Sequence, residues 1–345
     1  MMLVRLMVSL PLSESGKYKN YKRQYCLFFV IILLWVVCMY LEHYKNRLDD
    51  IPSFLNKYLN VPSLCRLKRV GYFCGMDYAS KNIYNFSEYI SRYDHSLTVA
   101  LMIYKLTGDK KATIAGLLHD IATPCFSHVI DYMNGDYITQ ESTEAYTEKI
   151  ILNDKELLNC LELDNIDVSD VVNFKKYSLV DLDRPSLCSD RLDGIILTGM
   201  GWTKNISLDD IDRIVNSMCV YKNENNLDEI GLNDLDVLKR VVEINDLINV
   251  YCQSMEDNYM MNLLADITRI GIKNNLFTYD DLYRLTEVEL FSILNNCDVV
   301  EIKNLLNIFY NIKKEDIPNR EMPKIKIRKI NPIYRGSRWS DVKDF

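Results

Sequence analysis

Residues 111–121 read KATIAGLLHDI and predict a helix that is apolar almost all round. A surface helix keeps one polar face, so this pattern places the helix in the centre of the fold. Pro124 restricts the residue before it and is expected to end the helix. The preceding residues 86–108 carry apolar side chains at spacings of three and four, which predicts a long amphipathic helix. A short turn at Asp109 and Lys110 would make the two helices an antiparallel pair.

The rest of the chain also favours a mainly helical protein. Of its 345 residues, 48% are hydrophobic and 26% charged, with only 12 Gly and 8 Pro. These values exclude a disordered chain and disfavour a turn-rich β barrel or sandwich. Further helices are predicted over 125–133, 141–153, 186–200, 231–256, 260–275 and 280–296. Residues 206–225 are expected to form a helix and a loop, and the alternating tail after Pro318 predicts a short strand or hairpin.

Charge and cysteine usage narrow the classes of function. The chain has 41 Lys and Arg against 48 Asp and Glu, a net charge of −7. Proteins that bind long nucleic acids usually carry a basic domain, so no such partner is expected. The negative net charge does not exclude a small anionic ligand, because a few arginines and a metal suffice to bind it. None of the ten cysteines lies in a C-x-x-C pair, so we predict free thiols in a reducing cytoplasm and no structural zinc site.

The N-terminal region holds an uncharged stretch, residues 25–41, of 17 residues. This length is the lower limit for a membrane-spanning helix. Three interpretations are open: a membrane anchor, a signal peptide, or a start assigned too early, with Met39 as the true first residue. The signal peptide is the weakest, because Cys38-Met39-Tyr40 is a poor cleavage site. We therefore separate residues 1–45 from the fold; the predicted location is cytoplasmic, or membrane-anchored if 25–41 is an anchor.

Three of the four histidines, His95, His119 and His128, fall within 34 residues. Histidine is the usual side chain for metal binding and for proton transfer near neutral pH. His119 is followed directly by Asp120 at the end of a buried helix, where a carboxylate costs several kcal/mol unless it is paired or bound to a cation. The antiparallel helix pair would bring His95 toward His119. Asp190 is a second carboxylate on an otherwise core-facing helix surface.

The order of these residues resembles the HD superfamily of metal-dependent phosphohydrolases. The matching text is RYDHSL at 92–97, GLLHDI at 116–121 and CSDRLD at 188–193, and the resemblance covers about residues 60–200. It implies an all-α helical bundle in which His95, His119, Asp120 and Asp190 hold one or two divalent ions of Mn, Fe, Ni, Zn or Mg. It also implies an HD domain over 46–225 and a helical C-terminal region with a short strand tail over 226–345.

Within that superfamily the sequence is most similar to the dNTP triphosphohydrolase branch, which includes the deoxyguanosine triphosphatases. That branch reads R-F-E-H-S where this chain has RYDHS at 92–96, and both end the second motif in F-S-H. The branch carries a middle histidine where this chain has Thr123, and a later His-Glu where it has Gln140 and Glu141. Two histidines associated with triphosphate chemistry are therefore replaced, and the choice between monophosphate and triphosphate release stays open.

The resemblance implies that water activated by the metal attacks phosphorus. His128 is expected to protonate the leaving oxygen or position the water, and Asp131, on the same helix face, to orient His128. Arg92, one helical turn from His95, is expected to bind phosphoryl oxygens. The other predicted substrate-binding residues are Arg184, Arg191 and Thr123.

The predicted function is hydrolysis of a nucleotide or another small phosphoester. One alternative is a catalytically inactive HD module that acts as a nucleotide sensor or scaffold, which the replacements at Thr123 and Gln140 favour. Another is an oxygenase, for which Glu141 is the obvious spare carboxylate ligand. The predicted partner is a small phosphorylated substrate; a homo-oligomer and a membrane contact through residues 25–41 are further expectations.

Overall fold

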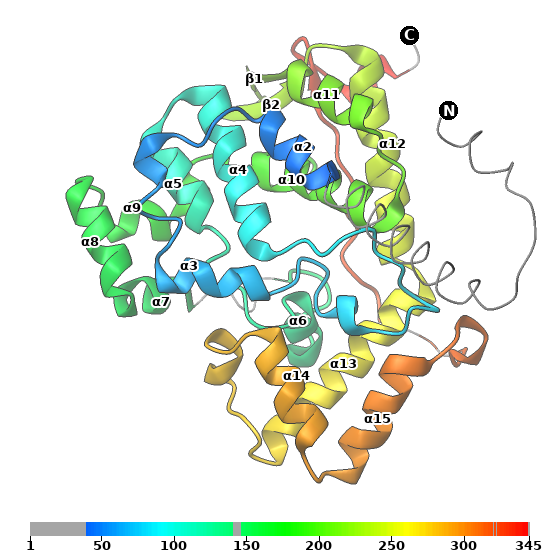
Figure 1. The fold of residues 1–345 in the computed structure, drawn as a ribbon. Helices are drawn as coiled ribbons and strands as arrows, with labels where there is room; N and C mark the ends of the chain where they lie inside the picture. Colours follow the sequence, from blue (N-terminus) through cyan, green and yellow to red (C-terminus); the bar gives the residue numbers. More distant parts are fainter. Residues whose placement is uncertain (1–38, 141–145, 320, 322, 344–345) are drawn as a thin grey trace, which may run out of the picture. The chain divides into compact units, whose positions relative to one another are not determined.

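The structure is a computed structural model that describes residues 39–140, 146–319, 321 and 323–343. Leu41–Phe345 forms one compact unit, and Figure 1 shows its mainly helical architecture. The predicted membrane segment 25–41 lies, apart from its last three residues, outside the described residues, and so does Glu141. Within the described ranges, no helix combines the length and the apolar character that crossing a membrane requires.

The predicted mainly helical fold is confirmed. The helices that build the body are α2 (Met39–Arg47), α3 (Pro62–Arg66), α4 (Arg92–Thr107), α5 (Lys110–Leu118), α6 (His128–Asn134), α7 (Thr147–Asn153), α8 (Lys155–Leu163), α9 (Val168–Val172), α10 (Ser189–Thr198), α11 (Leu208–Ser217), α12 (Leu235–Cys252), α13 (Met255–Lys273), α14 (Glu287–Asn296), α15 (Val300–Asn311) and α16 (Trp339–Val342). The strands are β1 (Met218–Lys222), β2 (Asp228–Leu232), β3 (Ile333–Tyr334) and β4 (Ser337–Arg338).

Helices α4 and α5 form the predicted antiparallel pair, joined at Gly108, whose φ of +66° favours glycine. Helix α4 begins at Arg92 and not at residue 86, because Ser91 and Asp94 form a capping box. The Ser91 side chain accepts a hydrogen bond from the Asp94 amide, and the Asp94 carboxylate accepts one from the Ser91 amide. Tyr89, which the predicted helix included, lies before the helix and is 45% exposed.

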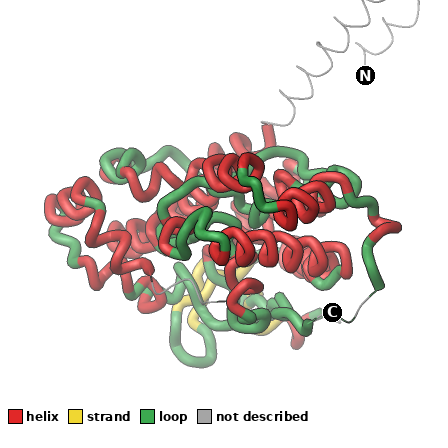
Figure 2. Tube along the Cα trace, turned by 90° about the horizontal axis from the view of Figure 1, so that it is seen from below, coloured by secondary structure: helices red, strands yellow, loops and turns green. Residues whose placement is uncertain are grey.

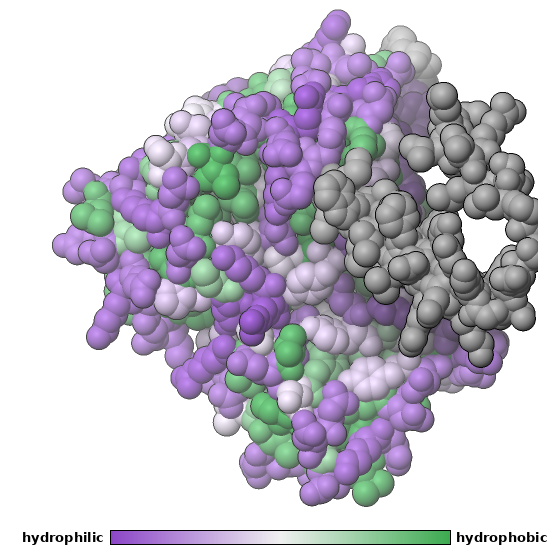
Figure 3. All heavy atoms as spheres, in the orientation of Figure 1, coloured by the Kyte–Doolittle hydropathy of each residue, from purple (hydrophilic) through white to green (hydrophobic). Residues whose placement is uncertain are grey.

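The core confirms the central position of the KATIAGLLHDI segment, since every residue of α5 from Ala112 to Leu118 is buried. One hydrophobic cluster surrounds α4 and α5 and includes residues of α7, α8 and α9. A second cluster joins α6 to α13, α14 and α15. On the described surface in Figure 3, hydrophobic residues lie in small groups among hydrophilic ones.

A small sheet with the order β1-β2-β3-β4 joins two hairpins from distant parts of the chain. The C-terminal hairpin, β3 and β4, confirms the predicted strand tail. The hairpin of β1 and β2 corrects the prediction of a loop up to residue 225, since Met218–Lys222 pairs antiparallel with Asp228–Leu232. Strand β2 also pairs with β3, through Gly231 and Ile333. Figure 2 shows the strands gathered in one place against the helices.

Several predicted helix boundaries are wrong for local reasons. The helix predicted from 125 begins at His128, because Phe126 and Ser127 have positive φ values of 67° and 45°. The helix predicted from 231 begins at Leu235, because β2 occupies residues 228–232. The helix predicted over 280–296 divides into a short 3₁₀ turn and α14, which Thr286 caps.

Candidate metal centre and cavity

The α4–α5 pair brings His95 and His119 together, as the sequence predicts. Their ring centroids lie 5.2 Å apart. His95 is buried in the first half of α4, and His119 follows the last residue of α5. Their ring nitrogens and a carboxylate oxygen of Asp120 lie within 4.8 Å of one another. Three side chains with metal-binding atoms therefore converge where α5 ends.

Asp190, in the first turn of α10, completes this group. Its Oδ1 lies 3.0 Å from His95 Nε2 and 3.6 Å from His119 Nε2. Asp120 Oδ2 lies 3.7 Å from His95 Nε2. All four predicted ligands, His95, His119, Asp120 and Asp190, are thus gathered around one point, which we call the metal centre.

Hydrogen bonds on the far side of each ring aim both histidines at the metal centre. His119 Nδ1 donates to the Gly116 carbonyl at 2.7 Å, which leaves the lone pair of the neutral ring on Nε2. His95 Nδ1 lies 2.7 Å from Asp193 Oδ2, and the Tyr44 hydroxyl donates to Asp193 Oδ1 at 2.6 Å. A carboxylate behind a ligating histidine is a recurrent feature of metal sites.

The residues fit a bound divalent ion. His119 Nε2 is buried and has no hydrogen-bond partner among the described residues, although it faces two carboxylates. A buried polar atom of this kind needs an explanation, and a bound ion is one of the common ones. Two imidazoles and two carboxylates suit Mn²⁺, Fe²⁺, Ni²⁺ or Zn²⁺, and more weakly Mg²⁺.

The electrostatics of the metal centre favour a cation. Burial lowers the pKa of His95, but hydrogen bonds to Asp190 and Asp193 outweigh burial and raise it to about 10. Burial raises the pKa of Asp120, but His119, Arg92 and His95 together lower it to about 2. Burial also raises the pKa of Asp190, but hydrogen bonds from His119 and His95 outweigh burial and lower it. Both carboxylates therefore hold their negative charge, and they stabilise protons on the two histidines or a metal ion that replaces those protons.

Arg92 lies beside the metal centre, as predicted. Its Nη1 donates to Asp120 Oδ2 at 2.8 Å, and its Nε donates to the Ser127 hydroxyl at 3.2 Å. The guanidinium is almost wholly buried. It is therefore fixed next to a metal-ligating carboxylate.

His128 and Asp131 form the predicted pair at the start of α6. His128 Nδ1 lies 2.9 Å from Asp131 Oδ2. Asp131 is buried, whereas the His128 side chain is 37% exposed. Burial lowers the pKa of His128, and Arg92 and Arg328 lower it further, against the opposing effect of Asp131. A neutral imidazole held by a carboxylate is therefore available for proton transfer near neutral pH.

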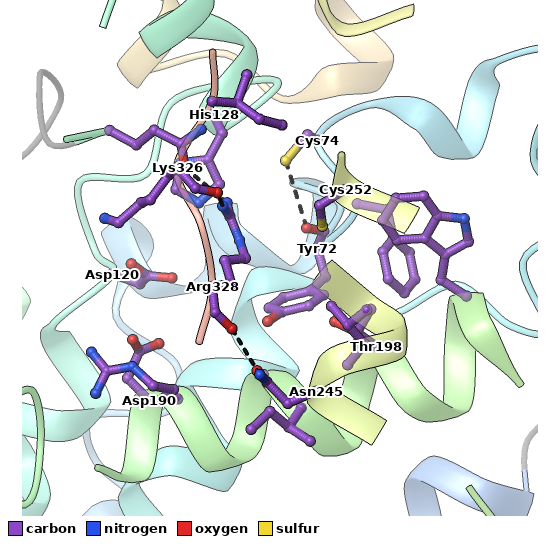
Figure 4. Close-up of a pocket in the computed structure, with 18 of the residues that line it drawn as sticks. Tyr72, Cys74, Asp120, His128, Asp190, Thr198, Asn245, Cys252, Lys326 and Arg328 are labelled. Carbon is purple, nitrogen blue, oxygen red and sulfur yellow. Dashed lines mark hydrogen bonds between the residues drawn. The ribbon is translucent and has the colours of Figure 1, made fainter. Parts of the chain in front are cut away.

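A cavity of about 510 Å³ opens onto the metal centre. His119, Asp120 and Asp190 line one part of it, together with His128. Figure 4 shows Asp120 and Asp190 on one side, Tyr72, Thr198 and Cys252 on the other, and Arg328 between them. The lining also contains the aromatic residues Phe86 and Trp202.

The remaining predicted substrate-binding residues differ in their surroundings. Arg184 lines the cavity. Arg191 lines it too, but its guanidinium donates to the backbone carbonyls of Leu182 and Ser186. Thr123 is not among the lining residues, and its carbonyl accepts a hydrogen bond from Arg66. Gln140, at the position of the replaced histidine, does line the cavity.

Sequence reasoning missed Asp193 and Arg328. Asp193 lies three residues after Asp190 in the quoted CSDRLD motif, so a second carboxylate on that helix face was the available signal. Arg328 lies in the basic tail, and no local pattern connects that tail to the histidines.

Comparison with known proteins agrees with this geometry. Residues 92–188 match the family model described as HD domain. The uncharacterized protein YdhJ of Bacillus subtilis is 26% identical over 262 residues, which are 72% of this chain and 76% of that protein. The metal-dependent phosphohydrolase cns2 of Cordyceps militaris is 25% identical over 137 residues, 38% of this chain and 37% of that protein.

The match to the family model includes His95, His119 and Asp120 and ends two residues before Asp190. The match and the metal centre therefore share three residues, His95, His119 and Asp120. Residues 92–188 of this chain are therefore similar to an HD domain.

Proposed function

We propose that this protein is a metal-dependent phosphohydrolase that acts on a nucleotide or another small phosphoester. The observation that carries the proposal is the buried, unpartnered His119 Nε2, which faces Asp120 and Asp190 beside His95. The HD domain supports it, and so does the name of the Cordyceps relative, a metal-dependent phosphohydrolase.

His95, His119, Asp120 and Asp190 would hold one or two divalent ions. A divalent ion in such a site polarises a phosphoryl oxygen and lowers the pKa of water. The hydrogen bonds from His95 to Asp193 and from His119 to Gly116 keep both Nε2 atoms directed at the metal centre.

Arg92 would bind a phosphoryl oxygen next to the metal centre. Its guanidinium already touches Asp120 and Ser127, so its position is fixed before substrate arrives. A fixed cation placed where negative charge develops lowers the barrier without reorganisation. His128, neutral in the free protein, would take a proton from the attacking water and pass it to the leaving oxygen, and Asp131 would hold the ring that does so.

The cavity supports a nucleotide among the small phosphoesters. Its volume of about 510 Å³ falls in the range of ligand pockets for organic molecules. Phe86 and Trp202 add aromatic surface to the lining, which suits a planar ring. The RYDHS and FSH motifs, which resemble the dNTP triphosphohydrolase branch, also favour a nucleotide.

The test is phosphate release by the full chain with Mn²⁺, Fe²⁺, Ni²⁺, Zn²⁺ or Mg²⁺. The substrates are dNTPs, NTPs, nucleoside monophosphates and an aryl phosphate, and the inactive control is Asp120→Ala. We expect turnover of a nucleotide with at least one metal, and none by the variant. A folded protein that binds metal but turns over no substrate would overturn the proposal and favour a sensor.

A further inference from the structure

The C-terminal tail crosses the cavity and places Arg328 inside it. Asn245 of α12 donates to the Arg328 carbonyl at 2.7 Å, the contact drawn in Figure 4. The Arg328 amide donates to Asn249 Oδ1 at 2.8 Å. Two residues earlier in the chain, the Lys326 amide donates to the Tyr137 carbonyl. Backbone hydrogen bonds to α12 and to Tyr137 therefore hold the tail in place. The Arg328 side chain makes none of these contacts.

The Arg328 guanidinium forms no ion pair with a described carboxylate, although the buried Asp257 interacts with it at longer range. Its Nη2 donates to Gln140 Oε1 at 2.8 Å, and an amide oxygen brings no full negative charge. No carboxylate oxygen of the described residues lies within 4.0 Å of it. Arg92 differs, because Asp120 pairs with it.

Arg184 has similar surroundings. It lines the same cavity and donates to the Lys329 carbonyl at 3.3 Å, one residue from Arg328. It also has no carboxylate within 4.0 Å among the residues that the structure describes. Burial lowers its pKa to about 10, and the nearby Arg191 and Arg328 contribute to that shift. Asp190 opposes that shift. Two half-buried guanidinium groups whose charges repel each other would be stabilised by a bound anion.

We propose that Arg184 and Arg328 form an anion subsite for a second phosphate group of the substrate, separate from the phosphate at the metal centre. The distinction rests on the contacts: Arg92 donates to a carboxylate of the metal centre, whereas Arg184 and Arg328 donate to backbone and amide oxygens. The guanidinium fork suits phosphate oxygens. The substrate class is therefore a compound with linked phosphates, such as a nucleoside di- or triphosphate. The hydrolysis of such a compound rests on the proposed function, whereas the binding of its second phosphate group does not.

The test measures pyrophosphate binding to the full chain by calorimetry, at fixed ionic strength and with a chelator present. No turnover occurs under these conditions, so the result does not depend on hydrolysis. Arg328→Gln and Arg184→Gln should each raise the Kd at least about tenfold, the effect of losing a hydrogen bond to a charged group. Lys329→Gln, an exposed charge on the same tail, should change the Kd by less than about twofold.

Kinetics then connect the subsite to the substrate. Arg328→Gln should raise KM for a nucleoside triphosphate by a similar factor and leave KM for an aryl phosphate unchanged. An equal rise in KM for both substrates in Arg328→Gln would overturn the inference. So would a pyrophosphate Kd that stays unchanged in Arg328→Gln and Arg184→Gln. If binding responds as expected but no substrate turns over, the subsite stands and the hydrolase proposal fails.

Discussion

His95 Nδ1 lies 2.7 Å from Asp193 Oδ2, between residues 98 apart in the sequence. Asp193 is wholly buried, and its other oxygen accepts a hydrogen bond from Tyr44 of α2. The first helix of the compact unit is thus connected through Asp193 to a predicted metal ligand. The orientation of His95 depends on residues that never touch the ion.

Asp193→Asn should weaken metal binding about 10- to 100-fold, the usual effect of losing a carboxylate that holds a metal-ligating histidine. Titration of the metal-free chain with Mn²⁺ measures this directly. The matched control is Asp212→Asn, which breaks a His–Asp contact of 2.6 Å at His43, on the surface. Equal metal affinity in both variants would mean that Asp193 does not position His95.

Tyr44→Phe removes the hydroxyl that satisfies Asp193 Oδ1. A buried acceptor left without its donor costs about 1–3 kcal/mol. We expect the free energy of unfolding in urea to fall by that amount, with an unchanged slope. An unchanged free energy would show that water replaces the hydroxyl.

Glu287 makes the stability of the fold depend on pH. Burial and, to a lesser degree, Asp77 raise its pKa from 4.5 to about 8. The folded chain therefore binds more protons than the unfolded chain between these values, and stability falls as pH rises through that window. Glu287→Gln should increase the free energy of unfolding by about 2 kcal/mol at pH 8.5, with a smaller gain toward pH 5.

Glu289→Gln, in the same helix, is the control, because the contribution of Glu289 to stability changes with pH in the opposite direction. Hydrogen bonds from Thr286 lower the pKa of Glu289, so its contribution is present above the unfolded value and lost in acid. Thermal unfolding of both variants between about pH 3 and 8.5 checks the two slopes, that of Glu289→Gln below its unfolded pKa of 4.5 and that of Glu287→Gln above 4.5. A Glu287→Gln variant less stable than the original chain at pH 8.5 would contradict the assignment.

His128→Gln should lower kcat by about 10²–10⁴ while metal content stays the same, because the imidazole lies outside the metal centre. Asp131→Asn should cause a smaller loss, since it removes only the group that orients the ring. Metal analysis alongside the rate measurement separates this result from simple loss of the ion. Full activity in His128→Gln would remove His128 from the mechanism.

Local sequence patterns predicted the parts of the fold that depend on near neighbours. The α4–α5 pair follows from helical periodicity and a short turn, and it brings His95 to His119. Asp190 was found because a carboxylate on an apolar helix surface needs a partner. The HD motifs then connected these residues to a family.

Contacts between distant residues were not predictable in this way. Strand β2 pairs with β3 a hundred residues later, so residues 218–232 alone could not show that their hairpin belongs to a four-stranded sheet. Gln140 and Arg328 meet across 188 residues. The start of α4 depended on the Ser91–Asp94 capping box, which a periodic apolar stripe does not reveal.

The most direct test of the central claim compares two histidine variants, His119→Gln and His43→Gln, in metal content and phosphate release. His119 Nε2 faces Asp120 and Asp190, whereas His43 pairs with Asp212 away from the metal centre. We predict that His119→Gln loses both bound metal and nucleotide hydrolysis, and that His43→Gln keeps both. A His119→Gln variant that retains metal and activity would contradict the account.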